Sequence, residues 1–185
     1  MNHIRYVFYW EAYENNPSMF LHELENVANL ADKWGLKIIY DNHQYHTSSW
    51  LDEKRGTGFP SFLFDKNLYP FDSGITTSSN STKLWWTNWW NRNITYQNYN
   101  NSSTNKIDGW SLQANFLKTI VKLLDNHNST NGYEILNEPH IFSQDQWSKI
   151  GKYYKYMIEE LRNQTNKTIV IDMTIPITFK DSSII

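Results

Sequence analysis

The residues Asn137-Glu138-Pro139 have the types and spacing for acid–base chemistry, because they end the short apolar run Tyr133–Leu136 with a carboxylic acid. We expect that run to be a buried parallel strand, and catalytic side chains of α/β barrels collect where such strands end. A glutamate there can donate or accept a proton, and the amide of Asn137 can hydrogen-bond a substrate hydroxyl. The combination suggests cleavage of a glycosidic bond, a reaction that needs two carboxyl groups, of which Glu138 is one.

Polar side chains also stand in or after three other strand-like runs. Arg5 lies within the first run, Asp41-Asn42-His43 follows the second, and Asp172 lies near the end of the last. The carboxyl ends of parallel strands meet at one edge of a sheet. We therefore expect these side chains to lie on the same side of the molecule as Glu138.

The chain alternates strand-like and helical segments. The strand-like runs are residues 4–10, 36–40, 133–136 and 168–173. Apolar residues recur at helical spacing between them, which predicts a helix capped by Asn16 and stopped by Gly35, a second capped by Ser111, and a third that opens with the capping-box pattern Ser143-X-X-Gln146. This order requires parallel strands joined by helical crossovers, which amounts to about half of an eightfold α/β barrel.

Length and composition limit the classes of function. The 185 residues suffice for one domain, whereas a complete α/β barrel takes about 250. A net charge of −2 gives no basic surface for nucleic acid, and no apolar run approaches the ~20 residues of a membrane span. The absence of cysteine excludes disulfides and thiol catalysis. Recurrent Asn-X-Ser/Thr sequons fit an extracellular protein, although the first residues carry no signal-peptide apolar region.

Three spaced motifs resemble glycoside hydrolase family 5, the cellulase-type retaining β-glycanases. Ile4-Arg5-Tyr6-Val7 is similar to the family's arginine-bearing second strand, and Ile38–His43 is similar to its third-strand Asp-X-His motif. Tyr133–Pro139 is similar to its fourth-strand signature, which ends in Asn-Glu-Pro. The resemblance implies a TIM (β/α)8-barrel fold, here a partial barrel that covers about strands 2–5 with their intervening helices.

The resemblance also implies roles for individual residues. Glu138 would be the acid/base that protonates the glycosidic oxygen and then activates water, and Asn137 would bind the sugar 2-hydroxyl. Arg5 and His43 would surround the site, bind substrate and support the nucleophile by charge and hydrogen bonding. The family uses no cofactor, so none is expected.

The resemblance has gaps. The family's nucleophile is a glutamate on the seventh strand, and neither that strand nor the first has a counterpart in residues 1–185. We therefore expect a single partial catalytic domain with negligible turnover on its own. The expected function is endo-acting cellulase or β-glucanase activity on β-1,4-glycans in polysaccharide catabolism, with a polysaccharide or oligosaccharide and the missing C-terminal strands as partners. The alternatives are a non-catalytic carbohydrate-binding protein and an inactive half-barrel that associates with another chain.

Other titratable residues near these motifs have simpler interpretations. We expect Asp41 and Glu134 to be buried partners of neighbouring donors. His43 and His46 form a His-X-X-His pattern, but nothing else in the sequence completes a metal site, and we expect none. His140 either lines the cleft or covers it.

Residues 47–110 form a long aromatic connection of about sixty residues with little periodicity, and connections of that length are commonly functional. Flat aromatic faces suit sugar rings, so we expect Trp85 and Trp89 to bind substrate. The other interpretation is that these rings pack the connection onto the barrel, because Trp85-Trp86 and Trp89-Trp90 repeat at a helical spacing of four.

Overall fold

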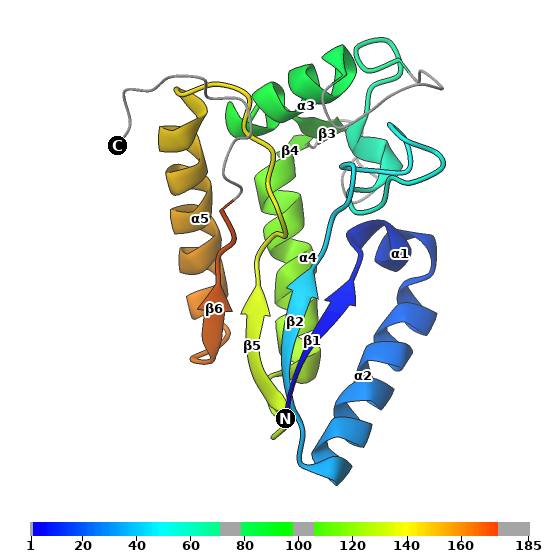
Figure 1. The fold of residues 1–185 in the computed structure, drawn as a ribbon, viewed down its shortest axis with the longest axis vertical. Helices are drawn as coiled ribbons and strands as arrows, with labels where there is room; N and C mark the ends of the chain where they lie inside the picture. The colour runs from blue at the N-terminus through cyan, green and yellow to red at the C-terminus, as the bar shows by residue number, and fades with distance from the viewer. Residues whose placement is uncertain (1, 71–78, 98–105, 174–185) are drawn as a thin grey trace.

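The computed structural model describes residues 2–70, 79–97 and 106–173. Its main sheet contains four strands in the order β1-β2-β5-β6, and every neighbouring pair is parallel (Figure 1). These strands are β1 (His3–Phe8), β2 (Lys37–Asn42), β5 (Thr130–Glu134) and β6 (Thr168–Val170). The predicted parallel arrangement is confirmed, although β1 ends two residues before the expected Trp10, because Trp10 already begins a short helix, α1 (Trp10–Asn15).

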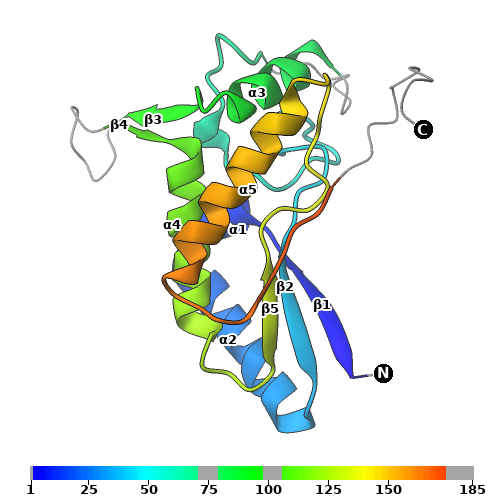
Figure 2. The same ribbon diagram turned by 90° about the vertical axis from the view of Figure 1, so that its left-hand side faces the viewer.

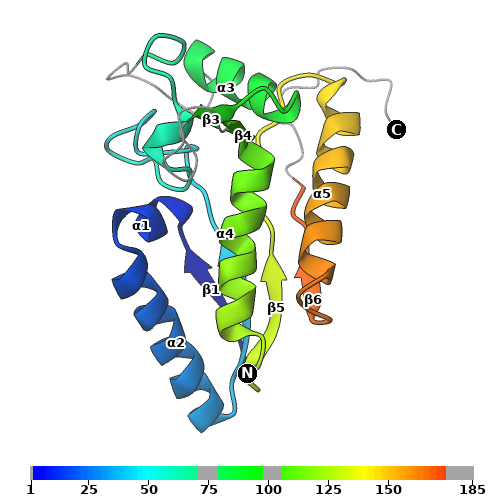
Figure 3. The same cartoon turned by 180° about the vertical axis from the view of Figure 1, so that it is seen from behind.

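Three long helices lie on one face of this sheet, as Figures 2 and 3 show. They are α2 (Pro17–Trp34), α4 (Gly109–Leu124) and α5 (Gln146–Arg162). Ile38 and Tyr40 of β2 are fully buried in the hydrophobic core. Because side chains alternate along a strand, Asp41 points to the opposite face, and the register places Glu134 beside it on the neighbouring strand. The polar residues of interest therefore occupy the face without helices.

The predicted limits of α2 are confirmed. The Asn16 side chain accepts a hydrogen bond from the Met19 backbone N–H at 3.1 Å, which satisfies one free donor of the first turn. Pro17 occupies the first turn, where its missing N–H is no loss. Gly35 ends the helix with a φ of 64°, a left-handed conformation that glycine adopts without the steric penalty of a side chain.

The predicted starts of the two later helices are wrong. Asp108, not Ser111, caps α4, since its carboxylate accepts from the Ser111 backbone N–H at 3.1 Å. No capping box forms at α5: the Asp145 N-cap makes no side-chain cap bond. The Gln146 side chain instead accepts from the Phe142 backbone N–H at 2.8 Å and donates to the Thr87 hydroxyl. Gln146 therefore fastens the preceding loop to α3 (Asn80–Trp90).

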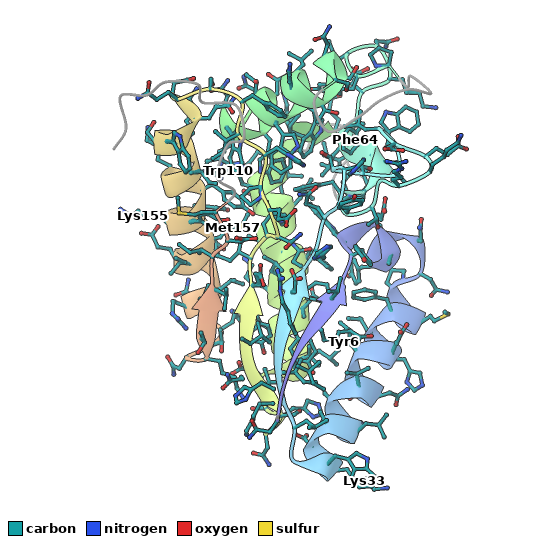
Figure 4. All side chains as sticks on the ribbon, in the orientation of Figure 1. Tyr6, Lys33, Phe64, Trp110, Lys155 and Met157 are labelled. Carbon is teal, nitrogen blue, oxygen red and sulfur yellow. The ribbon has the colours of Figure 1, made fainter. Side chains whose placement is uncertain are left out.

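Residues 47–110 are not a structureless connection over their described part. They contain the short 3-10 helix η1 (Ser61–Leu63), α3, and an antiparallel pair, β3 (Thr95–Gln97) and β4 (Lys106–Asp108). These elements lie at the end of the sheet toward which the strands run (Figure 1), and Figure 4 shows Phe64 and Trp110 among the side chains there. The region adds an aromatic layer above the carboxyl ends of the strands.

No helix among the described residues is both long enough and apolar enough to cross a membrane.

Candidate active site

Asn137 is the centre of a polar cluster beyond the carboxyl ends of the strands. Its backbone N–H donates to the Asn42 carbonyl at 3.1 Å, so pairing of the β5 segment with the β2 segment continues past the last assigned strand residue, Glu134. The Asn137 side chain accepts from Arg5 Nη2 at 2.8 Å and donates to the Gln44 carbonyl at 3.1 Å. These opposed contacts fix which end of the amide carries the oxygen.

Arg5 connects three strands through one guanidinium. It donates Nε to Glu134 Oε2 at 2.9 Å and Nη2 to Glu134 Oε1 at 2.7 Å, which is a bidentate pair. The same Nη2 lies 3.1 Å from Asp41 Oδ2. The Arg5 side chain is 49% exposed, whereas the side chains of Glu134 and Asp41 are 4% and 0% exposed. Two buried carboxylates therefore share one half-exposed cation, as expected for paired structural roles of Asp41 and Glu134.

The electrostatics of Glu134 follow from this arrangement. Burial raises the pKa of the Glu134 carboxyl above its usual value, and the hydrogen bonds and charge of Arg5 oppose that rise. The negative charges of Asp41 and Asp172 raise it further. For Arg5, burial lowers the pKa, but the bond to Glu134 and the surrounding carboxylates outweigh it, so the net pKa is raised and the guanidinium stays charged.

His43 completes the cluster. Its Nδ1 lies 2.8 Å from Asp41 Oδ2, and its Nε2 lies 3.3 Å from Asn137 Nδ2. The hydrogen-bond network assigns the proton to Nδ1, where the carboxylate accepts it, and leaves Nε2 as an acceptor for the Asn137 amide. The 3.3 Å contact is long for an N–H donor, so this amide hydrogen is available to a better partner.

Hydrogen bonds fix the backbone of Glu138, while its side chain is exposed. Its N–H donates to Asp172 Oδ2 at 2.9 Å, and its carbonyl accepts from Gln44 Nε2 at 2.7 Å. Its φ of 42° lies in the left-handed region, which is sparsely populated for residues with a side chain. Such strain persists where the surroundings enforce it, and it clusters at functional sites. The structure thus presents an exposed carboxyl from a fixed backbone.

The predicted site residues divide into two groups. Arg5, His43 and Asn137 lie in one hydrogen-bonded cluster, and Glu138 follows directly on Asn137. The expectation that Trp85 and Trp89 offer faces to a sugar does not fit the structure, because both indoles are 0% exposed.

The two indoles stack on each other at 5.2 Å, and both contact Phe59. Both faces of each ring are therefore covered where α3 packs onto the core. The four-residue spacing marks packing residues, as the second interpretation of the sequence states.

Gln44 was missed from the sequence, and Asp172 was expected on this side of the sheet but without a positioning role. Gln44 is fully buried and donates to the Asn137 and Glu138 carbonyls at 3.1 and 2.7 Å. Asp172 accepts from the Glu138 N–H, and its own carbonyl accepts from the Tyr154 hydroxyl. Gln44 follows the Asp-X-His motif directly, which was the available signal. Asp172 was expected near the end of the last strand, and the structure adds its hydrogen bond with the Glu138 backbone.

The histidines outside this cluster have other partners. His46 Nδ1 lies 2.8 Å from Asp52 Oδ2, and His140 packs its ring against Trp86 and Phe142. Burial, with a smaller effect of nearby His46, lowers the pKa of His140 to about 4. Among the residues that the structure describes, no group of three or more His, Asp or Glu side chains has an arrangement that could hold a metal ion.

The sequence matches one family model, described as Cellulase (glycosyl hydrolase family 5), over residues 1–175. A search of curated proteins found no match.

Several solved structures share the fold. Endo-glycoceramidase II from Rhodococcus sp., in a complex with a cellobiose-like imidazole, superposes with a TM-score of 0.75 at 15% identity, over 92% of this chain and 40% of that one. An endogalactoceramidase gives a TM-score of 0.69 at 15% identity, over 92% and 40% of the two chains. Pseudomonas stutzeri endoglucanase Cel5A gives 0.51 at 16% identity, over 93% and 39%. The chain thus spans about 40% of the length of the structures that it matches.

Proposed function

The chain belongs to the cellulase family, glycosyl hydrolase family 5, and we propose that Glu138 is the acid/base of a retaining glycoside hydrolase site. The family fold is a TIM barrel, and the four parallel strands are a partial barrel equivalent to about strands 2–5. The observation that carries the proposal is the exposed Glu138 carboxyl on a backbone fixed by Gln44 and Asp172. General acid catalysis needs a carboxyl that a bound substrate can reach within hydrogen-bond distance, and the exposed Glu138 carboxyl is open to such contact.

In the proposed reaction Glu138 gives its proton to the glycosidic oxygen as the bond between that oxygen and the anomeric carbon breaks. A second carboxylate attacks the anomeric carbon to form a glycosyl-enzyme. Glu138, now ionised, takes a proton from water as the water displaces that carboxylate. In the family the second carboxylate belongs to the seventh strand, which the four described strands do not include.

Asn137 and its neighbours orient the sugar in this scheme. Asn137 Nδ2 lies 3.3 Å from His43 Nε2, and the weakly bonded hydrogen between them can be donated to the 2-hydroxyl of the substrate, a contact that tightens in the transition state. Arg5 fixes the opposite end of the same amide at 2.8 Å. Its partly exposed positive charge also favours an ionised nucleophile on the face without helices.

We propose a β-1,4-glycan, of the cellulose or β-glucan type, as the substrate. The family description and the cellulase-type motifs around Arg5, His43 and Glu138 support this choice. The second candidate is the glycan of a glycolipid, because the two ceramide-glycan hydrolases have the higher TM-scores. The remaining alternatives are a non-catalytic carbohydrate-binding role and an inactive half-barrel that associates with another chain. The sequons support action outside the cell.

The test uses the full-length product of the gene that encodes residues 1–185, with cellopentaose and ganglioside GM3 as substrates. We expect Glu138→Gln to lower kcat about 10²–10⁴-fold on the accepted substrate. The matched control is Glu25→Gln, on the exposed surface of α2, which should leave kcat unchanged. Equal kcat values for wild type and Glu138→Gln would refute the acid/base assignment. Sugar binding without turnover by the wild type would favour the non-catalytic role.

A further inference from the structure

Backbone strain concentrates at the candidate site, in two adjoining segments. Besides Glu138, the loop after β2 contains two consecutive non-glycine residues in the left-handed region, His46 with a φ of 54° and Thr47 with a φ of 73°. A β-branched residue rarely adopts this conformation. Observed strain of this kind indicates a loop whose shape is enforced by its surroundings and justifies a search for function.

This loop is fastened directly to the acid/base segment. The Gln44 side chain donates to the carbonyl of Glu138 at 2.7 Å, and the Gln44 carbonyl accepts from the Asn137 side chain at 3.1 Å. Tyr45 is the next residue. The peptide group that joins Gln44 to Tyr45 is therefore the one whose carbonyl Asn137 contacts. These bonds fix the position of the Tyr45 backbone relative to Glu138.

The backbone of Tyr45 is fixed from the other side as well. Its N–H and its carbonyl both exchange hydrogen bonds with Thr57, each at 2.8 Å. Gly58 then crosses so close to Gln44 that an added Cβ would lie 2.5 Å from the Gln44 Cβ, and its φ is 135°. Only glycine allows this close approach. The loop is thus a built structure that presents Tyr45 in one place.

The Tyr45 side chain is an exposed aromatic ring with one face supported. It is 49% exposed, and its ring centroid lies 4.2 Å from that of His46 at an interplanar angle of 38°. His46 is itself held by Asp52 at 2.8 Å. Support on one side reduces the conformational entropy that the ring loses when a ligand packs on the other. In contrast, Trp85 and Trp89 have no free face.

We propose that Tyr45, supported by His46, is a stacking platform for a pyranose ring of the glycan chain next to the scissile bond. The axial C–H groups of a β-linked pyranose offer the apolar face that such a ring packs against. The proposal rests on the proposed function, since it places a sugar subsite beside Glu138. It assigns the substrate-facing aromatic role to the loop after β2 instead of α3.

The test is calorimetric titration of cellotetraose into the full-length gene product that carries the inactivating Glu138→Gln change. We expect Tyr45→Ala to weaken binding about tenfold, the loss of one ring contact. Tyr45→Phe should bind within about twofold, because stacking needs the ring and not the hydroxyl. The matched control is Trp34→Ala: Trp34 is 69% exposed and follows Lys33, which Figure 4 shows at the opposite end of the sheet. This control should bind like the parent.

Each outcome decides between the two proposals. Cellotetraose binding that is equal in the parent and in Tyr45→Ala overturns the platform and leaves the proposed function standing. Equal losses in Tyr45→Ala and Trp34→Ala also overturn it, since the effect would not be local. If the parent binds no cellotetraose, the platform and the β-1,4-glycan assignment both fall. Thermal unfolding of each variant checks that half-exposed Tyr45 is not needed for folding.

Discussion

Replacing Arg5 with methionine tests the electrostatic description of the site. The change removes the bidentate bonds to Glu134 at 2.9 and 2.7 Å and the contact with Asp41 at 3.1 Å. It leaves two carboxylates, whose side chains are 4% and 0% exposed, without this cation. Breaking a fully buried pair costs about 3–5 kcal/mol. Because Arg5 is 49% exposed, solvent screens part of the interaction, and we expect about 2–3 kcal/mol at pH 7.

The sign of the pH dependence follows from the raised pKa of Glu134. A carboxyl whose folded-state pKa lies above its unfolded value contributes stability below the unfolded pKa, and that contribution is lost as the pH rises through the folded pKa. Removal of Arg5 raises the folded pKa of Glu134 further. The destabilisation of Arg5→Met relative to wild type should therefore be larger at pH 7 than at pH 4.

Urea unfolding followed by tryptophan fluorescence at both pH values measures this difference, with linear extrapolation to water. Comparison of variant with wild type at each pH cancels the titration of groups that do not contact Arg5. Adding Glu134→Gln to Arg5→Met should restore at least half of the stability lost at pH 7, because the Glu134 position then holds no buried charge, and the buried Asp41 carboxylate keeps its hydrogen bond from His43 at 2.8 Å. Equal destabilisation at pH 4 and pH 7, with no recovery in the double variant, would refute the reasoning.

Three further predictions concern other parts of the chain. Burial lowers the pKa of His140 to about 4, so as the pH falls below about 6.5 the unfolded protein binds a proton at His140 before the folded protein does, and the folded protein loses stability. This loss reaches up to about 3 kcal/mol between pH 6.5 and 4, and it should be absent from His140→Phe in urea unfolding. A variant with the same pH profile as wild type would contradict the prediction. A Cβ on Gly109 would lie 2.6 Å from Trp89 Cζ3, so Gly109→Ala should destabilise the fold by about 1–3 kcal/mol, and an unaltered melting temperature would count against tight packing there. Glu138→Gly should lower kcat about 10²–10⁴-fold yet stabilise the fold by up to about 1 kcal/mol, since glycine tolerates a φ of 42°, whereas Glu138→Gln should leave stability unchanged; a less stable Glu138→Gly protein would contradict the inferred strain.

The main sheet was predictable because its signals are local. Residues 36–40 form a short β-prone run around Ile38 and Ile39, Asn16 and Pro17 start α2, and Gly35 ends it. The capping prediction at Ser111 failed because Asp108, three residues earlier, accepts from the backbone N–H of Ser111 itself, so the helix already includes Ser111 in its first turn. Local pattern alone does not rank two good caps that are one turn apart.

The elements within residues 47–110 were less predictable. The four-residue spacing of the tryptophans indicated α3, but the surrounding polar residues gave no stripe by which to place it. The burial of Trp85 and Trp89 depends on Phe59 and Gly109. Each of these residues lies twenty or more positions from both tryptophans in the sequence. Packing over such sequence distances leaves no periodic signal, so a sugar platform and a core residue looked alike.

The site itself was predictable to the level of residue types. Arg5, His43 and Asn137 were expected near Glu138, and the structure joins the first three by hydrogen bonds. The fixing of the Glu138 backbone was not predictable, because Gln44 and Asp172 act through contacts that the fold creates.

The most direct test of the central claim is azide rescue of Glu138→Ala in the full-length gene product, with 2,4-dinitrophenyl β-cellobioside as substrate. This leaving group departs without a proton, so the glycosyl-enzyme can form in the variant. Hydrolysis of the glycosyl-enzyme is then slow, because the general base, Glu138, is absent. Azide needs no base, and we predict faster turnover with β-cellobiosyl azide as the product, identified by NMR. An α-linked azide would mean that Glu138 is the nucleophile, and the absence of any rescue would contradict the acid/base assignment.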